Sequence, residues 1–184
     1  MKYYDIVILF HPNQSDRVPE MVDRYKKLIT ESGGEVILDQ DLERKKIHYT
    51  IKQHRSSKAH FVLLCIRCDV ATINQLTESF KFNDVIMRTL IVSRTAARTE
   101  NSPALLEKEE RSSGGRQARD LMKSLFKAED IYLNISFLRE HTLNTGRIMP
   151  GRVTGMNSKQ QRQFTRAVKW ARYLGLLCYC DRHA

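Results

Sequence analysis

The stretch YDIVILF, residues 4–10, consists of β-branched, aromatic and aliphatic side chains apart from Asp5, which is typical of a buried strand. The proline of HPN, residues 11–13, ends this strand. Apolar residues then recur from 18 to 29 at the i, i+3, i+4 spacing of an amphipathic helix, and the glycine pair 33–34 predicts the end of that helix. The chain is therefore expected to begin with a strand followed by a helix.

The next sixty residues continue the alternation of strand and helix. Residues 36–42 and 47–51 together indicate one strand in two parts, further strands are expected at 61–66 and 85–92, and a helical segment spans 70–80. The resulting order is βαββαβ. This order predicts a ferredoxin-like α+β sandwich over residues 1–94, with two helices on one face of a four-stranded antiparallel sheet.

Residues 95–126 interrupt this pattern and are expected to form a tail and linker. They are polar and charged, and RSSGGR at 111–116 has the composition of a flexible linker. A small all-α module is expected over 127–184. A short helix at 121–126 is expected just before this module. Within the module we expect a helix at 131–143, an extended stretch at 147–155 because of one proline and two glycines, and a last helix from Asn157 or Ser158 to about Leu177.

The charge of the chain is concentrated in this second module. The chain has 184 residues with 31 Lys and Arg against 21 Asp and Glu, a net charge of +10. Residues 1–94 carry +3, residues 95–120 are neutral, and residues 121–184 carry +7. A compact basic module is typical of proteins that bind a polyanion. No apolar run approaches the roughly 18 residues of a membrane helix, so we expect no membrane-spanning segment. The apolar face of the last helix is small and rich in alanine, so we expect no membrane partner at its surface either.

The last predicted helix separates its charges from its apolar residues. At about 100° per residue, five cations fall on one face and five apolar residues on the opposite face. The basic face comprises Lys159, Arg162, Arg166, Lys169 and Arg172. The apolar face comprises Phe164, Ala167, Val168, Ala171 and Leu174. Such a helix packs on one side and is suited to neutralising successive phosphates on the other.

Two sets of motifs in the chain resemble two known families. Residues 1–94 resemble bacterial-type small-subunit ribosomal protein six through YDIV at 4–7, HPNQS at 11–15, RKKI at 44–47 with Tyr49, and KFNDVIMR at 81–88. Residues 127–183 resemble small-subunit ribosomal protein eighteen through GRIMPGRVTG at 146–155, KQQRQ at 159–163 and ARYLGLL at 171–177. The first family usually has a glycine where this chain has Glu43.

The resemblance implies a structural constituent of the small ribosomal subunit and no enzymatic activity. Proteins of the two families pair with each other on the central domain of the small-subunit ribosomal RNA, so a chain with both resembles a fused heterodimer. The implied partners are that RNA, neighbouring small-subunit proteins and, within the chain, the two modules themselves. No cofactor or metal is implied, and the implied location is cytoplasmic and ribosome-associated, with an organelle ribosome as the alternative.

The expected site residues follow from the basic helix and from the resemblance. We expect contacts with ribosomal RNA at Arg147, Arg152, Lys159, Arg162, Arg166, Lys169 and Arg172 and, on the sandwich, at Arg44, Lys45, Lys46 and Arg88. In the family of ribosomal protein six, the C-terminal tail wraps around the partner protein. The resemblance therefore implies an interface between the two modules at Arg94, Leu105, Leu106, Phe164 and Val168.

Two alternative functions stay open. The first is a free RNA-binding repressor that acts on a messenger leader. The second is a thiol- or zinc-dependent protein on a ferredoxin-like scaffold, for which the candidates are CIRC at 65–68 and the group Cys178, Cys180 and His183. Side chains three apart on a strand point to opposite faces, which argues against a site at 65–68. The sequence contains no P-loop, dinucleotide fingerprint or nucleophile–base motif.

Overall fold

The computed structural model describes residues 1–51, 56–98 and 131–180. The chain divides into two compact units, Met1–Asn101 and Ser102–Ala184, which we call the sandwich unit and the helical unit. The expected linker at 111–116 and the expected helix at 121–126 lie outside the described residues. Each unit is described by itself.

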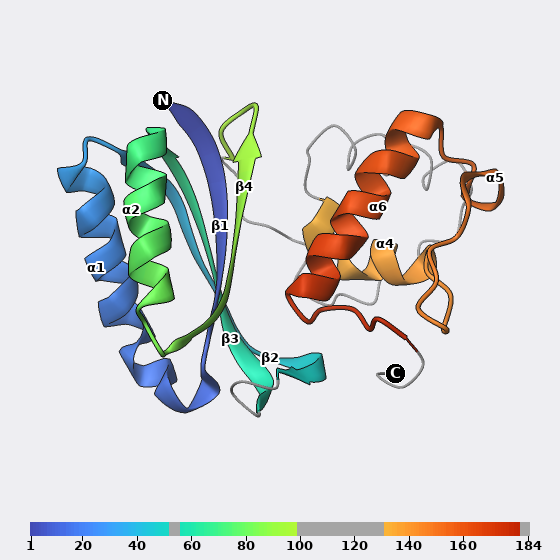
Figure 1. Cartoon of the computed structure of the whole chain (residues 1–184), viewed down its shortest axis with the longest axis horizontal. Coiled ribbons are helices and arrows are strands. Elements are labelled where there is room, and N and C mark those ends of the chain that lie inside the picture. The colour runs from blue at the N-terminus through green and yellow to red at the C-terminus, as the bar shows by residue number, and fades with distance from the viewer. Residues whose placement is uncertain (52–55, 99–130, 181–184) are drawn as a thin grey trace. The chain divides into compact units, whose positions relative to one another are not determined.

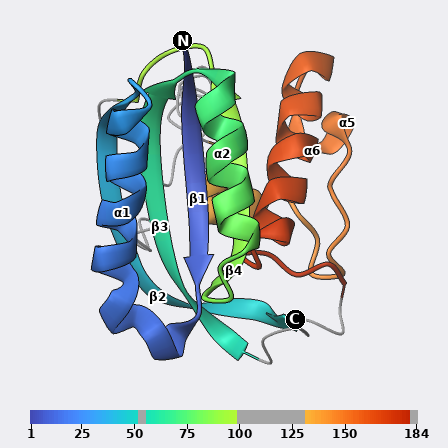
Figure 2. The ribbon, with the colours of Figure 1, turned by 60° about the vertical axis from the view of Figure 1, so that its left-hand side comes forward.

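The sandwich unit has the predicted βαββαβ order. Its elements are β1 (Lys2–Phe10), the 3-10 helix η1 (Pro12–Arg17), α1 (Val18–Glu31), β2 (Glu35–Ile51), β3 (Ser56–Cys68), α2 (Val70–Lys81) and β4 (Ile86–Arg94). The strands form one antiparallel sheet in the order β2-β3-β1-β4. Helices α1 and α2 lie side by side on one face of this sheet (Figures 1 and 2). The ferredoxin-like fold is therefore confirmed.

Alternation along β1 divides its side chains between the two faces of the sheet. Ile6, Ile8 and Phe10 belong to the core cluster under the helices, where Tyr25 of α1 and Phe80 of α2 meet edge to face with ring centroids 4.9 Å apart. Asp5, Val7 and Leu9 point to the opposite face. The sheet thus has two apolar faces, and one carboxylate lies within the second.

The second strand is longer than expected because a bulge joins the two predicted segments. The pairing of β2 with β3 shifts register between Asp41 and Arg44, and Glu43 between them has a φ of 61°. The amide of Glu43 donates a hydrogen bond to Oδ1 of Asp41 at 2.8 Å, which holds this turn of the backbone. A left-handed conformation costs an L-residue about 1–2 kcal/mol, so Glu43 is strained at a position where the resembled family has glycine.

Replacing Glu43 by glycine is expected to stabilise the sandwich unit. Relief of the left-handed strain gains about 1–2 kcal/mol, and the greater freedom of glycine in the unfolded chain costs about 0.5–1 kcal/mol, so the net gain lies between about 0 and 1.5 kcal/mol. Urea unfolding followed by circular dichroism measures this change. Lys46→Gly, at an exposed position of the same strand without positive φ, is the control and should destabilise. A lower unfolding midpoint for Glu43→Gly would contradict the expectation.

The helical unit contains η3 (Ile131–Leu133), α4 (Ile135–Glu140), α5 (Gly151–Thr154) and α6 (Ser158–Tyr173). The expected helix at 131–143 is split at Asn134, whose side-chain oxygen accepts from the amide of Phe137 at 3.0 Å and so starts a new helix. It also ends early, because Thr142 forms an isolated bridge with Ile148.

The expectation of a fully extended stretch at 147–155 is wrong. Residues 151–154 form a short helix, because the carbonyl of Pro150 accepts from Val153 at 2.9 Å and from Thr154 at 3.2 Å. Gly155, with a φ of 71°, ends this turn. A proline with fixed φ is compatible with the start of a helix, which the sequence argument did not consider.

Helix α6 begins at a capping box and ends before the predicted Leu177. Asn157 and Gln160 exchange side chain-to-backbone hydrogen bonds of 2.9 and 3.0 Å at its start. Gly175 has a φ of 78°, its amide donates to the carbonyl of Arg172, and the amide of Leu176 donates to the carbonyl of Ala171. This pair of bonds is a Schellman motif, which ends the helix at Tyr173.

The apolar face of α6 forms the core of the helical unit. Phe164 is fully buried and packs edge to face against Phe137, with ring centroids 5.9 Å apart. Trp170 meets Tyr132 of η3 in the same geometry at 5.6 Å. The predicted separation of α6 into an apolar and a basic face is confirmed, since its buried residues are Phe164, Ala167, Val168 and Ala171.

Candidate nucleic-acid interface

The exposed side of α6 presents four of the predicted cations to solvent. Lys159, Arg162, Arg166 and Lys169 are all exposed. Because α6 rises about 1.5 Å per residue, Arg162 and Arg166 are about 6 Å apart along its axis. Residues 147–180 contain seven Lys and Arg and no Asp or Glu, so no carboxylate of this stretch neutralises them. Within residues 147–180, the charged side chains on the exposed side of α6 are therefore all positive.

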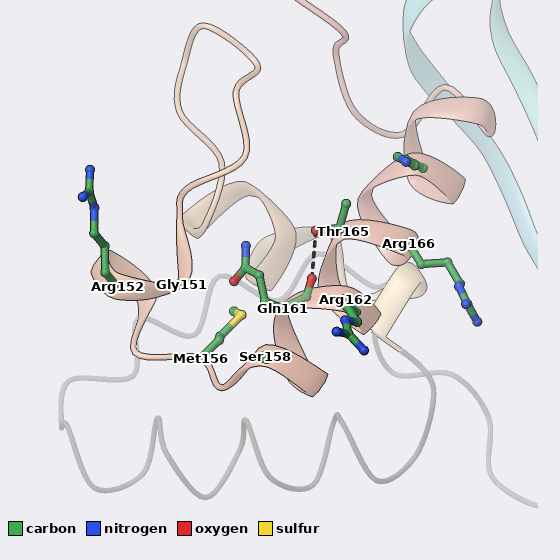
Figure 3. A pocket seen from close by; sticks show the side chains of 9 residues that line it. Gly151, Arg152, Met156, Ser158, Gln161, Arg162, Thr165 and Arg166 are labelled. Carbon is green, nitrogen blue, oxygen red and sulfur yellow. Dashed lines mark hydrogen bonds between the residues drawn. The ribbon is translucent and has the colours of Figure 1, made fainter.

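A groove of about 790 Å³ lies between α5 and α6 (Figure 3). Its lining residues are Gly151, Arg152, Met156, Ser158, Gln161, Arg162, Thr165, Arg166 and Lys169. Arg152 comes from α5, whereas Arg162, Arg166 and Lys169 come from α6. The fold thus brings four predicted cations from two helices to one concave surface.

Gln161 fastens α6 to the segment before α5. Its Nε2 donates to the carbonyl of Met149 at 3.0 Å. One helical turn later, the hydroxyl of Thr165 donates to the carbonyl of Gln161 at 2.8 Å (Figure 3). A Cβ on Gly151 would lie 3.1 Å from the carbonyl oxygen of Met156 and 3.5 Å from Oε1 of Gln161. Glycine at 151 therefore lets the two helical segments approach closely at the floor of the groove.

Arg147 and Arg172 meet at the turn formed by residues 144–147: Arg147 is part of the turn, and Arg172 contacts it from α6. The amide of Leu143 donates to the carbonyl of Arg147 at 2.8 Å, and Arg147 itself is exposed. Arg172 is half-buried, and its Nη2 donates to the carbonyl of Gly146. The guanidinium of Arg172 also lies 5.8 Å from the ring centroid of Tyr179. Arg172 thus differs from the exposed cations of α6.

The predicted cations of the sandwich unit lie on β2 and β4. Nε of Arg44 donates to the hydroxyl of Ser15 at 2.8 Å, and Lys46 is exposed whereas Lys45 is half-buried. Arg88 donates to the hydroxyl of Tyr49, and its guanidinium lies 5.3 Å from the centroid of that ring. These cations stay predicted RNA contacts.

A buried ion cluster occupies the second face of the sheet, and the sequence argument missed it. Asp5 is 1% exposed, Nη1 of Arg94 lies 2.7 Å from its Oδ2, and Nη1 of Arg98 lies 3.8 Å from the same oxygen. The side chains of both arginines are less than a tenth exposed. Arg94, expected at the interface between the modules, is therefore paired within its own unit.

Of the four other residues expected at the interface between the modules, the structure describes two. Phe164 and Val168 lie in the core of the helical unit, and Phe164 contacts Phe137 and His141 there. Leu105 and Leu106 lie outside the described residues. A role of these residues between the modules stays a prediction.

The two cysteines of CIRC lie on opposite faces of β3. Cys68 belongs to the core cluster under the helices, whereas Cys65 faces Asp5 across the β1–β3 register. Burial, with the charge and hydrogen bond of Asp5 added, raises the pKa of Cys65 to about 12, and burial raises the pKa of Cys68. Both thiols are therefore protonated and unreactive near neutral pH.

No metal-binding cluster of three or more His, Cys, Asp or Glu occurs among the described residues. His183, the third member of the expected tail group, lies outside them. None of the helices in residues 1–51, 56–98 and 131–180 is long and apolar enough to cross a membrane.

Each part of the chain matches a known protein family. A family model described as ribosomal protein S6 matches residues 3–93, and a second, described as ribosomal protein S18, matches residues 127–177. The chain is a fusion of these two families. Among solved structures, it is similar to the crystal structure of 30S ribosomal protein S6 from Thermotoga maritima. The identity is 23%, the match covers 50% of this chain and 87% of that chain, and the TM-score is 0.47.

These two families define the coarse function of the fusion. Both belong to the structural proteins of the small ribosomal subunit, and so does this chain. Ribosomal protein families are structural rather than enzymatic, and their members sit with ribosomal RNA and other small-subunit proteins.

Several groove residues were not predicted from the sequence, although a signal for them exists. Ser158, Gln161 and Thr165 recur at the i, i+3, i+4 spacing that places them on the same side of α6 as Arg162. Their position on the helical wheel, next to the cations, is the signal in the sequence that marks these polar residues.

Proposed function

We propose that this chain acts as a fused heterodimer that binds the central domain of the small-subunit ribosomal RNA. The observation that carries the proposal is the groove between α5 and α6, with Arg152, Arg162 and Arg166 among its lining residues. A concave surface with several cations, in a stretch (residues 147–180) that contains no carboxylate, favours the phosphates of an RNA strand.

The two helical segments supply cations from different directions. Arg152 lies on α5 behind the fixed φ of Pro150, and its backbone is therefore restrained before any ligand binds. Arg162, Arg166 and Lys169 follow one side of α6 at successive helical turns. Guanidinium groups held in this way lose little conformational freedom when they donate paired hydrogen bonds to phosphate oxygens.

The test measures binding of the full chain to a transcribed central-domain fragment over a range of salt concentrations. With the six exposed or groove-lining cations Arg147, Arg152, Lys159, Arg162, Arg166 and Lys169 on phosphates, log K should fall against log salt with a slope of about −4 to −5. An unrelated RNA of equal length is the competitor and should bind more weakly. A slope near zero, or equal affinity for both RNAs, would contradict the proposal. Sedimentation with small subunits separates this function from a free repressor.

We further propose that the two modules pair within the chain. In the sandwich unit, Val7 and Leu9 of β1 and Phe61 and Leu63 of β3 point away from α1 and α2. An apolar sheet face of this kind is unfavourable when it is exposed to water. The helical module, which belongs to the same chain, is the partner that we propose to bury it. Residues 95–126 would serve as tail and linker, and a short tether gives an effective concentration of about a millimolar.

Cleavage of the linker is expected to leave the two modules associated. A protease site introduced within residues 111–116 allows the chain to be cut after folding. Because the apolar sheet face stays covered, both fragments should elute together in size-exclusion chromatography at micromolar concentration. The control is the uncut chain, and two separate peaks for the cut sample would disprove the pairing.

A further inference from the structure

We propose that Arg172 is a positioning residue that holds Arg147 in place for RNA and is not itself a phosphate ligand. The inference rests on the proposed RNA-binding function. It concerns three parts of the helical unit: the C-terminal end of α6, the turn at 144–147, and the segment 178–180 that follows α6.

The first observation is the setting of the Arg172 guanidinium. It donates to the carbonyl of Gly146 and lies 5.8 Å from the ring centroid of Tyr179, so one planar group links the turn to the segment at 178–180. Its side chain is half-buried, whereas the other cations of α6 are exposed. A guanidinium combines several fixed donors with a flat face for an aromatic ring, and a lysine ammonium has no such flat face.

The second observation is that the backbone of the C-terminal segment lies directly on the turn. Gly146 has a φ of 78°, and a Cβ at this position would lie 2.6 Å from the carbonyl oxygen of Tyr179 and 3.1 Å from the amide nitrogen of Cys180. Only a residue without a side chain permits this approach. The turn and the segment at 178–180 are therefore packed backbone to backbone, with Arg172 beside them.

The third observation connects this packing to Arg147. The amide of Gly146 donates to the carbonyl of Leu143 at 2.8 Å, and the amide of Leu143 donates to the carbonyl of Arg147 at 2.8 Å. Displacement of Gly146 therefore moves the backbone of Arg147. Arg147 is exposed and leads through Ile148 to Met149, whose carbonyl Gln161 holds at the groove. Arg172 thus restrains the first cation of the proposed RNA surface.

The experiment compares variants that keep or remove charge, using the full chain and the central-domain RNA fragment. Arg172→Lys keeps the charge but loses the linked contacts, so affinity should fall about tenfold and the salt slope should lose about one unit because Arg147 no longer reaches its phosphate. Arg147→Gln should show the same loss, and adding it to Arg172→Lys should have little further effect. The matched control is Arg166→Lys, an exposed arginine on the same helix, which should change both quantities little.

The opposite result is a direct phosphate contact by Arg172. In that case Arg172→Lys keeps the salt slope, and its effect adds fully to that of Arg147→Gln; either outcome overturns the inference. A chain that ends at Leu177 provides a second variant, and it should reproduce the loss seen with Arg172→Lys.

Hydrogen exchange tests the positioning role without RNA. Arg172→Lys and Tyr179→Ala should both speed the exchange of the amides of Leu143 and Gly146, and leave the amides of α1 unchanged. Unchanged exchange at the turn would overturn the inference even if the chain binds RNA. A chain that fails to bind RNA but shows faster exchange would instead overturn the proposed function.

Discussion

A chain that carries Arg152→Glu together with Arg166→Glu is expected to lose about two to four orders of magnitude in affinity for the central-domain RNA fragment. A hydrogen bond to a charged group contributes about 1.5–3 kcal/mol, so two lost contacts cost about 3–6 kcal/mol. Both residues line the groove from different helices and are exposed. The reversed charges therefore repel the phosphates on two sides while the fold is kept.

The matched control reverses two exposed cations outside the proposed surface. Arg24→Glu with Lys27→Glu on α1 makes the same change in net charge and should lower affinity by less than about tenfold. Filter binding at moderate salt measures the affinities, and circular dichroism confirms that both variants are folded. If the two double variants bind equally well, the groove is not the RNA site.

The second large effect concerns stability. Asp5→Asn is expected to destabilise the sandwich unit by about 3–5 kcal/mol, because it removes the carboxylate that faces the buried guanidinium groups of Arg94 and Arg98. The amide of asparagine is close in size to the carboxyl group, so the loss comes from charge and not from packing. Urea unfolding of the full chain, followed at the transition of the sandwich unit, measures the change.

Asp69→Asn is the control for this variant. Asp69 is exposed before α2 and makes no side-chain capping bond there, so the same chemical change should alter the free energy of unfolding by less than about 0.5 kcal/mol. Equal unfolding midpoints for the two variants would show that the ion cluster contributes nothing to stability.

The sandwich could be predicted in detail because its strands follow simple periodic rules. YDIVILF at 4–10 became β1, and the apolar spacing from Val18 became α1. The bulge at Glu43 was not predicted, because glutamate rarely adopts a positive φ and so does not indicate a left-handed backbone. The cluster around Asp5 was not predicted either, since Arg94 at the end of β4 and Arg98 after it lie about ninety residues further along the chain.

The basic surface was predicted from one helical wheel, but its shape was not. The wheel placed Arg162, Arg166 and Lys169 on one side of α6, and these residues do line the groove. The wheel also placed Arg172 on the basic face. Its guanidinium, however, donates a hydrogen bond to the carbonyl of Gly146, a contact that depends on the turn at 144–147. Periodicity assigns a residue to a face, whereas long-range contacts decide what it does there.

The composition of residues 147–180 has a consequence for how binding responds to acidity. This stretch contains no carboxylate and no histidine, the two kinds of side chain that ordinarily gain or lose a proton between about pH 4 and pH 7. Between pH 5 and pH 7 its charge is therefore constant. Changes in ionic strength alter the attraction of this surface for RNA, whereas acidification within that range leaves it unchanged.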